Sequence, residues 1–241
     1  FAVDYIIHGA SNASPELYIS NPVDTMLSNF VGMKNLLDYA LKKSVKSVVY
    51  VSSSEVYGKK ENNAPYLEDE YGYINILDVR SSYSSSKRAT ETLCKSYSEQ
   101  FGVAIKIVRP GHIYGPGLKI TDKRISSAFM YDAIRGKNLV MKSKGEQLRS
   151  YCHSLDCASA ILTVLLQGKS GEAYNISNKK SIISIREMAY IISEVAGVKL
   201  FFELPNELEE KQKNPMNNSS LDSTKLEKLG WVGMFEPKEG L

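Results

Sequence analysis

The sequence has few cysteines, and their number and spacing exclude two kinds of cross-linked protein. Three of the 241 residues are cysteine, namely Cys94, Cys152 and Cys157. An odd number argues against a disulfide framework, and no two of them have the C-x-x-C spacing that is typical of structural zinc sites. We therefore expect three reduced thiols, no metal site and a cytoplasmic protein.

The sequence also lacks long apolar runs and long runs of one charge. No stretch approaches the roughly 18 consecutive apolar residues of a membrane span, and the first residues do not have the order of a signal peptide. Thirty Lys and Arg against 27 Asp and Glu give a net charge of +3, which is spread along the chain. This pattern predicts no membrane segment and no nucleic-acid surface, and it is compatible with a small anionic ligand.

What is present is a regular alternation of apolar strands and helices in the first half. The expected elements are a buried strand at 1–8, a helix at 22–43, a strand at 47–52, a helix at 82–100 and a strand at 103–108. Met26, Phe30, Leu37 and Leu41 mark one face of the first helix. This order is typical of a parallel sheet wound with helices. Because the chain opens inside a strand and without Met, we expect the complete protein to continue upstream of Phe1.

The alternation weakens after Pro110. The expected elements there are helices at 126–135, 155–166 and 185–196 and strands at 139–141, 173–177 and 199–204. The fold class is therefore α/β: a Rossmann-like, doubly wound parallel sheet whose N-terminal βαβαβ part is missing, with a smaller interleaved α+β substrate domain. We place the partial cofactor domain at 1–115, joined by about 147–178, and the mainly substrate-binding domain at 116–241.

The strongest chemical signal is a Y-x-x-x-K pattern, Tyr83 to Lys87, on the helix expected at 82–100. Residues four apart share one helix face, so the phenol and the ammonium can reach the same ligand. A tyrosine with a pKa of about 10 is a poor base at neutral pH, and lowering that pKa by roughly 3 needs about 4 kcal/mol. The Lys87 cation and an oxidised nicotinamide ring could supply it. The pattern alone occurs by chance in many helices.

Two further polar segments follow neighbouring strands of the predicted sheet. Residues 53–58 (S-S-E-V-Y-G) follow the strand at 47–52, and residues 109–116 (R-P-G-H-I-Y-G-P) end the strand at 103–108. Doubly wound sheets bind ligands at the carboxyl ends of their strands. Either segment alone is equally compatible with an ordinary turn. Together with Tyr83 and Lys87 they indicate one ligand site.

With these segments the sequence resembles the extended short-chain dehydrogenases that act on nucleotide sugars, which include epimerases, dehydratases and decarboxylases. The resemblance covers nearly the whole chain. It is carried by residues 4–11 (D-Y-I-I-H-G-A-S), Asn29, residues 53–58, Tyr83 with Lys87, Arg149 within 145–151 (G-E-Q-L-R-S-Y), and residues 221–231.

The resemblance implies a role for each matching residue. The implied catalytic residues are Ser53, Tyr83, Lys87 and Glu55. The implied cofactor contacts are His8, Gly9, Ala10, Ser11 and Pro110, together with Tyr83 and Lys87. The implied substrate contacts are Ser54, His112 and Arg149, the last of which would hold the pyrophosphate. The cofactor is then NAD, with NADP left open, the partner is a nucleotide-diphosphate sugar, and the assembly is a homodimer.

The sequence departs from the family in several places. The glycine-rich turn that cradles the cofactor pyrophosphate is absent from these residues and is expected upstream of Phe1. His112 stands where the family usually has Asn. His8 is equally compatible with a packing role, and Arg109 with a structural ion pair. A catalytically silent or truncated NAD-binding scaffold is the rival reading, although Tyr83 and Lys87 are both present.

If the resemblance holds, Tyr83 removes the proton of a sugar hydroxyl, most often at C4, and a transient keto sugar forms. Ser54 stands where dehydratases with a Thr-Asp-Glu motif carry an acid, so we expect an epimerase or a decarboxylase ahead of a 4,6-dehydratase. Residues 68–75 and Arg80 resemble UDP-glucuronate decarboxylases. Against that, the Arg-Lys-Pro of those enzymes reads Lys-Asn-Pro at 213–215 here.

Overall fold

A four-stranded parallel sheet is built from three strands of the first half of the chain and one strand of the second half. The computed structural model describes residues 2–117, 122, 124–205 and 216–241, so the 213–215 segment lies outside the described residues. The sheet has the order β1 (Tyr5–His8), β2 (Ser47–Val51), β3 (Ile105–Pro110) and β7 (Ala173–Ile176). Each neighbouring pair is parallel. The predicted wound parallel sheet is confirmed.

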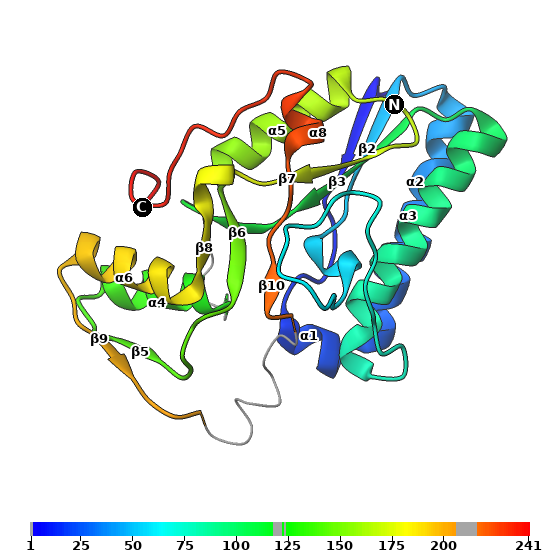
Figure 1. Ribbon diagram of the computed structural model, residues 1–241. Coiled ribbons are helices and arrows are strands. Elements are labelled where there is room, and N and C mark those ends of the chain that lie inside the picture. The colour runs from blue at the N-terminus through cyan, green and yellow to red at the C-terminus, as the bar shows by residue number, and fades with distance from the viewer. Residues whose placement is uncertain (1, 118–121, 123, 206–215) are drawn as a thin grey trace.

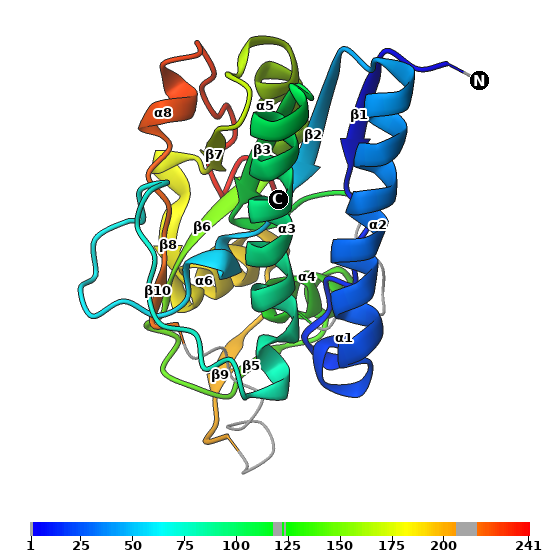
Figure 2. The same ribbon diagram turned by 90° about the vertical axis from the view of Figure 1, so that its right-hand side faces the viewer.

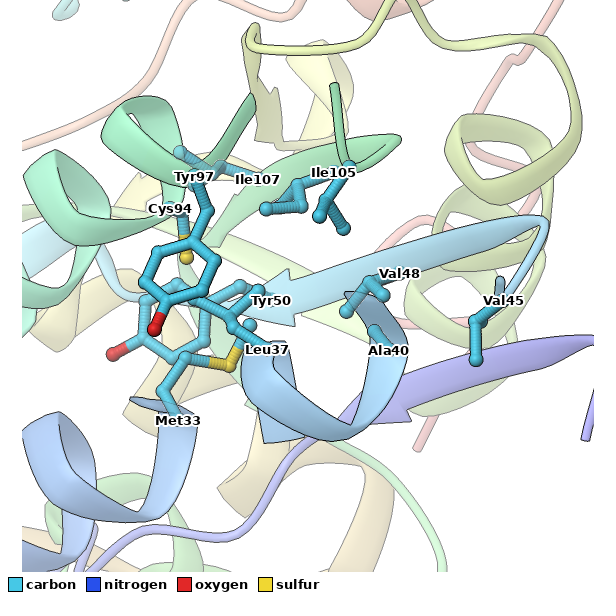
Figure 3. Packing of buried hydrophobic residues seen from close by; sticks show 11 residues of the cluster. Met33, Leu37, Ala40, Val45, Val48, Tyr50, Cys94, Tyr97, Ile105 and Ile107 are labelled. Atoms are coloured by element: carbon cyan, nitrogen blue, oxygen red, sulfur yellow. The ribbon is translucent and has the colours of Figure 1, made fainter. Parts of the chain in front are cut away.

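Helices cover both faces of this sheet. Helices α2 (Pro22–Lys43) and α3 (Ser82–Phe101) lie side by side on one face, and α5 (Ser154–Gln167) lies on the other (Figures 1 and 2). Because side chains alternate along a strand, Val48 and Tyr50 of β2 pack under α2 and α3, whereas Val49 packs toward α5. Figure 3 shows the cluster under α2 and α3. Apolar burial on both faces explains why β2 reads as a continuous apolar run.

Two expectations about buried faces are wrong. The strand expected at 1–8 covers only Tyr5–His8 and is buried only at His8, because β1 is the edge of the described sheet and Tyr5 and Ile7 are 48% and 46% exposed. The buried face of α2 is also offset from the predicted one: its buried residues are Thr25, Asn29, Met33, Leu37 and Ala40. Of the four predicted residues only Leu37 is buried there. The polar Thr25 and Asn29 hid this face from a search for apolar periodicity.

The second half is built from shorter strands with mixed pairing. Its elements are β4 (His112–Tyr114), α4 (Ile125–Ile134), β5 (Leu139–Met141), β6 (Leu148–His153), β8 (Ile182–Ser184), α6 (Ile185–Ala196), β9 (Leu200–Phe202) and β10 (Asn218–Ser219). β6 pairs in parallel with β4 and β10 and antiparallel with β8. β5 pairs in parallel with β9. In Figure 1 these elements lie beside the four-stranded sheet.

Short local elements complete the chain. They are α1 (Pro15–Ser20), the 3-10 turns η1 (Ser54–Tyr57), η2 (Val79–Ser81) and η3 (Lys179–Ser181), and α8 (Thr224–Glu227). The predicted capping box of α6 is confirmed, since Ser184 and Glu187 bond reciprocally. The division of the chain into two interleaved domains stays a prediction. No helix among the described residues has the length and apolarity to cross a membrane.

Candidate functional site

The predicted polar segments meet at one edge of the four-stranded sheet. Residues 8–11 end or follow β1, η1 follows β2, and residues 111–116 follow β3, at the carboxyl ends of three adjacent parallel strands. Helix α3 packs against η1 and β3, which brings its N-terminal half to the same edge. Helix α2 fixes this position through Asn29, whose Nδ2 donates to Ser86 Oγ of α3 at 3.1 Å. The sequence-predicted residues of these segments are therefore collected at one place.

Lys87 is a buried cation. Its side chain is 2% exposed, and its Nζ donates to the carbonyl oxygen of Val51, the last residue of β2, at 2.9 Å. The ammonium also lies 4.8 Å from the ring centroid of Tyr50 and 5.7 Å from that of Tyr83. Burial lowers the pKa of Lys87 to about 8. Lys87 is therefore held beside Tyr83, and its ammonium loses its proton at a lower pH than that of an exposed lysine.

The Tyr83 hydroxyl is enclosed and shares hydrogen bonds with two other hydroxyls. Burial raises the pKa of Tyr83 to about 12, while hydrogen bonds with the hydroxyls of Ser53 and Tyr18 and the charge of Arg124 oppose that rise. The Tyr18 ring stacks on the Tyr83 ring at 4.3 Å and 8°. Burial outweighs the other effects, so the described residues do not by themselves lower this pKa as the sequence analysis expected.

The turn after β2 presents a carboxyl group to two arginines. Ser53 caps η1, since its Oγ accepts a hydrogen bond from Glu55 N at 3.2 Å. Burial raises the pKa of Glu55, and the charges of Arg80 and Arg149 oppose that rise. Arg80 Nη1 lies 3.6 Å from Glu55 Oε2. Ser54 is buried on the same turn.

His112 and Arg149 lie on paired strands, β4 and β6, and the charge of Arg149 also acts on Glu55. Burial, reinforced by the charge of Arg149, lowers the pKa of His112 to about 3, so this ring is neutral. Arg149 is 3% exposed, and its guanidinium donates to the carbonyl oxygens of Leu148 and Met216 at 2.8 and 2.9 Å. Arg149 is thus held partly by backbone, which fixes its direction.

Sequence reasoning missed two residues of this site, Tyr18 and Arg124. Tyr18 lies on the short α1, and Arg124 directly precedes α4 and acts electrostatically on Tyr18, Tyr83 and His112. Neither belongs to a spaced motif. Their signal was local: Tyr18 follows the cofactor-like segment 8–11 closely, and Arg124 begins the helix after the 109–116 segment.

The edge can accommodate a cofactor. Among the described residues, the buried side-chain atoms His8 Nδ1, Ser11 Oγ, Ser52 Oγ and His112 Nδ1 have no hydrogen-bond partner. Buried polar atoms are normally paired, so these four point to a ligand-facing surface. A Cβ built on Gly9 would meet nothing within 4 Å, which leaves this backbone open to close approach. These residues fit the polar cofactor that the sequence resemblance implies.

Two other observations limit where chemistry can occur. A cavity of ≈ 810 Å³ opens in the second half, lined in part by Lys144, Glu146, Arg186 and Glu203, and none of the predicted site residues lines it. The Tyr83 edge is the better candidate, because it joins a candidate base to a buried lysine ammonium and to buried polar atoms that have no partner among the described residues. Within the described ranges, no three His, Cys, Asp or Glu side chains are grouped to hold a metal ion.

The comparison with protein families identifies this arrangement. The model of the NAD dependent epimerase/dehydratase family matches residues 1–177, which is most of the chain. The chain belongs to this family. Membership confirms the prediction of an NAD-dependent enzyme of the nucleotide-sugar-modifying type.

Curated relatives and solved structures agree with that assignment. UDP-glucuronic acid decarboxylase 3 of Arabidopsis thaliana is 33% identical over 99% of this chain and 68% of that protein. UDP-glucuronic acid decarboxylase 1 of Xenopus tropicalis is 32% identical over 99% of this chain and 55% of that protein. The dTDP-glucose 4,6-dehydratase of Streptomyces venezuelae, solved with NAD bound, has a TM-score of 0.84 at 25% identity, covering 99% of this chain and 70% of that one. UDP-glucose 4-epimerase of Thermotoga maritima has a TM-score of 0.86 at 23% identity, covering 98% and 74%. These structures confirm the Rossmann-like fold.

Proposed function

We propose that the complete protein oxidises a nucleotide-diphosphate sugar at C4 and that Tyr83 is the base. The observation that carries this proposal is the meeting of the Tyr83 hydroxyl, the Ser53 hydroxyl and the buried Lys87 ammonium at the carboxyl edge of the sheet. Tyr83 takes the proton of the C4 hydroxyl, and Ser53 hydrogen-bonds that same oxygen. Lys87 supplies positive charge beside the phenol.

The cofactor contributes the part of the reaction that side chains cannot perform. NAD, when bound, accepts a hydride from C4 and returns it later. Residues 8–11, Pro110 and Lys87 would hold it, with NADP left open. To act near neutral pH, the pKa of Tyr83 must fall from about 12 to about 7, which requires about 7 kcal/mol of preferential phenolate stabilisation. Lys87 and the positive nicotinamide ring are the charges placed to supply it.

Among the subclasses, we propose decarboxylation of a UDP-linked uronic acid. Two curated relatives described above are UDP-glucuronic acid decarboxylases. In addition, the Arg80 guanidinium lies 3.6 Å from Glu55 Oε2, and its buried Nε has no hydrogen-bond partner among the described residues, which suits a substrate carboxylate close to C4. Oxidation at C4 makes a β-keto acid, which breaks its C5–carboxyl bond and releases carbon dioxide. The electron pair left at C5 takes up one proton from water. Tyr83 then gives the proton that it removed back to the C4 oxygen as C4 is reduced again.

A C4 epimerase is the second candidate, because burial keeps the His112 ring neutral, which suits an uncharged sugar as well. Dehydration is disfavoured by Ser54, which lacks the acidity to expel a hydroxyl as water. Ser54, His112 and Arg149 would contact the substrate in either case, with Arg149 directed at the diphosphate.

The subclass can be decided by product analysis. The complete enzyme with NAD is incubated separately with UDP-glucuronate, UDP-glucose and dTDP-glucose, and the products are resolved by mass and retention time. We expect a product lighter by one carbon dioxide from UDP-glucuronate. A product of unchanged mass and new retention time would establish epimerisation, and loss of water would overturn our weighting of Ser54.

An arginine variant separates a carboxylate substrate from a neutral one. Arg80→Gln should lower kcat/KM for UDP-glucuronate by about tenfold, as expected for one charge-assisted hydrogen bond. Arg135→Gln, at an exposed arginine after α4, is the matched control and should change nothing. Equal activity of Arg80→Gln and wild type on UDP-glucuronate would exclude a carboxylate contact there.

The homodimer and the cytoplasmic location belong to the same proposal. In support of a dimer, α2 exposes apolar side chains along its length, with Val23 66%, Leu27 53% and Val31 43% exposed. Light scattering on the complete protein tests the dimer. Fractionation of cells that express it tests the location.

A further inference from the structure

A buried ion pair joins β3 to the helix that carries Tyr83 and Lys87. Arg109 Nε donates to Glu91 Oε1 at 3.0 Å, and Arg109 Nη2 donates to Glu91 Oε2 at 2.6 Å. Arg109 is 2% exposed and Glu91 7%. Of the readings that the sequence left open for Arg109, the structure therefore shows the ion pair. Burying two charges costs desolvation energy that their attraction often only balances, so stability alone does not account for this pair.

The remaining donors of Arg109 hold the segment that follows the Ser53 turn. Arg109 Nη1 donates to the Tyr57 hydroxyl at 2.8 Å and to the Glu68 carbonyl oxygen at 2.7 Å. Arg109 Nη2 donates to the Tyr71 hydroxyl at 2.8 Å. Tyr57 is the last residue of η1, the turn that Ser53 caps. One guanidinium thus connects the turn with Ser53 and Glu55 to helix α3.

Glu91 lies four residues after Lys87 on α3, so the two side chains share a helix face. The titratable and charged groups that act on or face Lys87 are His8 from β1, Tyr50 from β2, and Tyr83, Glu91 and Cys94 from α3 itself. Glu91 is the carboxylate among them. Burial lowers the pKa of Lys87, and the charge of Glu91 opposes that effect.

We propose that Glu91, held in place by Arg109, is a positioning residue that sets Lys87 and the Ser53 turn relative to Tyr83. This inference rests on the proposed function of Tyr83 and Lys87. Its geometric part is the guanidinium that bonds both α3 and Tyr57. Its electrostatic part is a negative charge one turn from a buried ammonium. A pair with a purely structural role would fix the shape of the network and leave Lys87 unaffected.

The test is Glu91→Gln in the complete enzyme. Glutamine keeps the size of the side chain and can still accept a hydrogen bond from Arg109, but it removes the charge. Lys87 is titrated by NMR of ¹³Cε-labelled lysine, with its signal assigned by its loss in Lys87→Met. We expect the pKa of Lys87 in Glu91→Gln to be lower by about one pH unit, and kcat at pH 8 to fall by about fivefold with KM unchanged.

Two variants complete the design. Glu99→Gln removes an exposed carboxylate of the same helix, paired with Lys95 at 2.6 Å, and should leave the titration of Lys87 and kcat as in wild type. Glu91→Asp keeps the charge and should restore the alkaline limb of the pH profile. If Glu91→Gln does not fold, Lys87 is titrated instead in the Glu91→Leu/Arg109→Met double variant, which replaces the pair by apolar side chains. The pKa of Lys87 should again be lower than in wild type.

The inference is overturned if Lys87 titrates at the same pH in wild type and Glu91→Gln. It is also overturned if Glu91→Gln lowers the melting temperature so far that unfolded enzyme accounts for the whole loss of kcat. The NMR titration does not depend on turnover. A changed titration without any activity on the tested sugars would therefore contradict the proposed function and leave the coupling of Glu91 to Lys87 standing.

Discussion

Two polar clusters at the same edge of the sheet differ in how their hydrogen bonds are completed. The cluster around Arg109 is internally paired: its members are Arg109, Glu91, Tyr57, Tyr71 and Asn175. In the cluster around Tyr83, the buried atoms His8 Nδ1, Ser52 Oγ and His112 Nδ1 have no partner among the described residues. A completed network is rigid, whereas unpaired buried groups are costly unless a ligand meets them. The cluster around Arg109 is a scaffold that positions its neighbours, and the cluster around Tyr83 is the surface on which we expect chemistry.

The sharpest way to separate the two clusters is Tyr83→Phe, which removes the hydroxyl and keeps the ring that stacks on Tyr18. We expect kcat to fall by about 10³-fold, within the range of acid–base groups, while nucleotide-sugar binding and the melting temperature stay nearly unchanged. Steady-state kinetics and calorimetry on the complete enzyme measure this. Tyr73→Phe, at a tyrosine that is 70% exposed, is the control. If Tyr83→Phe turned over at the wild-type rate, Tyr83 could not be the base.

Disruption of the cluster around Arg109 should lower the free energy of unfolding. Arg109→Met leaves Glu91 buried without its partner, which should reduce the free energy of unfolding by about 3–5 kcal/mol. Urea unfolding measures the change. Lys95→Met removes one member of an exposed pair, whose side chains are 53% and 69% exposed, and should cost no more than about 1 kcal/mol. Equal costs in the two variants would mean that the Arg109 network is not a scaffold.

Lys87 belongs to the cluster around Tyr83, so its removal should abolish turnover. Because burial of its cation costs free energy, the same removal should stabilise the fold. Its pKa is lowered from 10.5 to about 8, so between these pH values the unfolded chain holds a proton that the folded chain has lost. Stability due to this group therefore rises with pH through that window and is lowest below it. Lys87→Met should raise the free energy of unfolding by about 3 kcal/mol at pH 7, with the difference gone above pH 10.5.

The control for this pH experiment is the other buried lysine of the same half. Lys106→Met on β3 removes an ammonium that bonds Ser47 Oγ at 2.6 Å, and it should leave kcat unchanged. Denaturant unfolding of both variants across pH 7 to 11 is the measurement. A Lys87→Met variant that is less stable than wild type at pH 7 would contradict the burial argument.

The smallest expected effect is that of Ser53→Ala. The Ser53 hydroxyl lowers the pKa of Tyr83, so its removal raises that pKa further and moves the acidic limb of the kcat profile to higher pH. We expect about a tenfold loss of kcat near neutral pH, with recovery at higher pH. Ser96→Ala, at an exposed serine on α3, serves as the control. A uniform loss at every pH would show that Ser53 acts on the substrate alone.

How far the sequence predicts this molecule depends on whether a local rule decides the structure. Helix α6 follows from its capping box, and β2 follows from an apolar run that is buried on both faces. β6 escaped prediction because it buries Arg149, Ser150 and His153, so it has no apolar signature. Its pairing with β10 joins residues that are about 70 positions apart, which no local pattern encodes.

The candidate site divides in the same way. Tyr83 and Lys87 could be found because their spacing on one helix is itself the chemical requirement. Tyr18, Arg124 and Glu91 belong to no spaced motif, since each meets the site through folding rather than through spacing. The pKa of Tyr83 also escaped, because burial, the effect that dominates it, is known only once the fold is known.

Gly111 lies where the four-stranded sheet meets the sheet of β4 and β6. Its N–H donates to the Ile176 carbonyl oxygen of the four-stranded sheet at 3.1 Å, while a Cβ built on it would come within 2.4 Å of the Ser150 carbonyl oxygen of β6. At Gly111 the four-stranded sheet, against which α3 with Tyr83 packs, therefore lies in direct contact with β6, the strand that pairs with β4 and His112. Any side chain at residue 111 would push β6 away from the four-stranded sheet and so move His112 relative to Tyr83, even though residue 111 itself has no chemistry to lose.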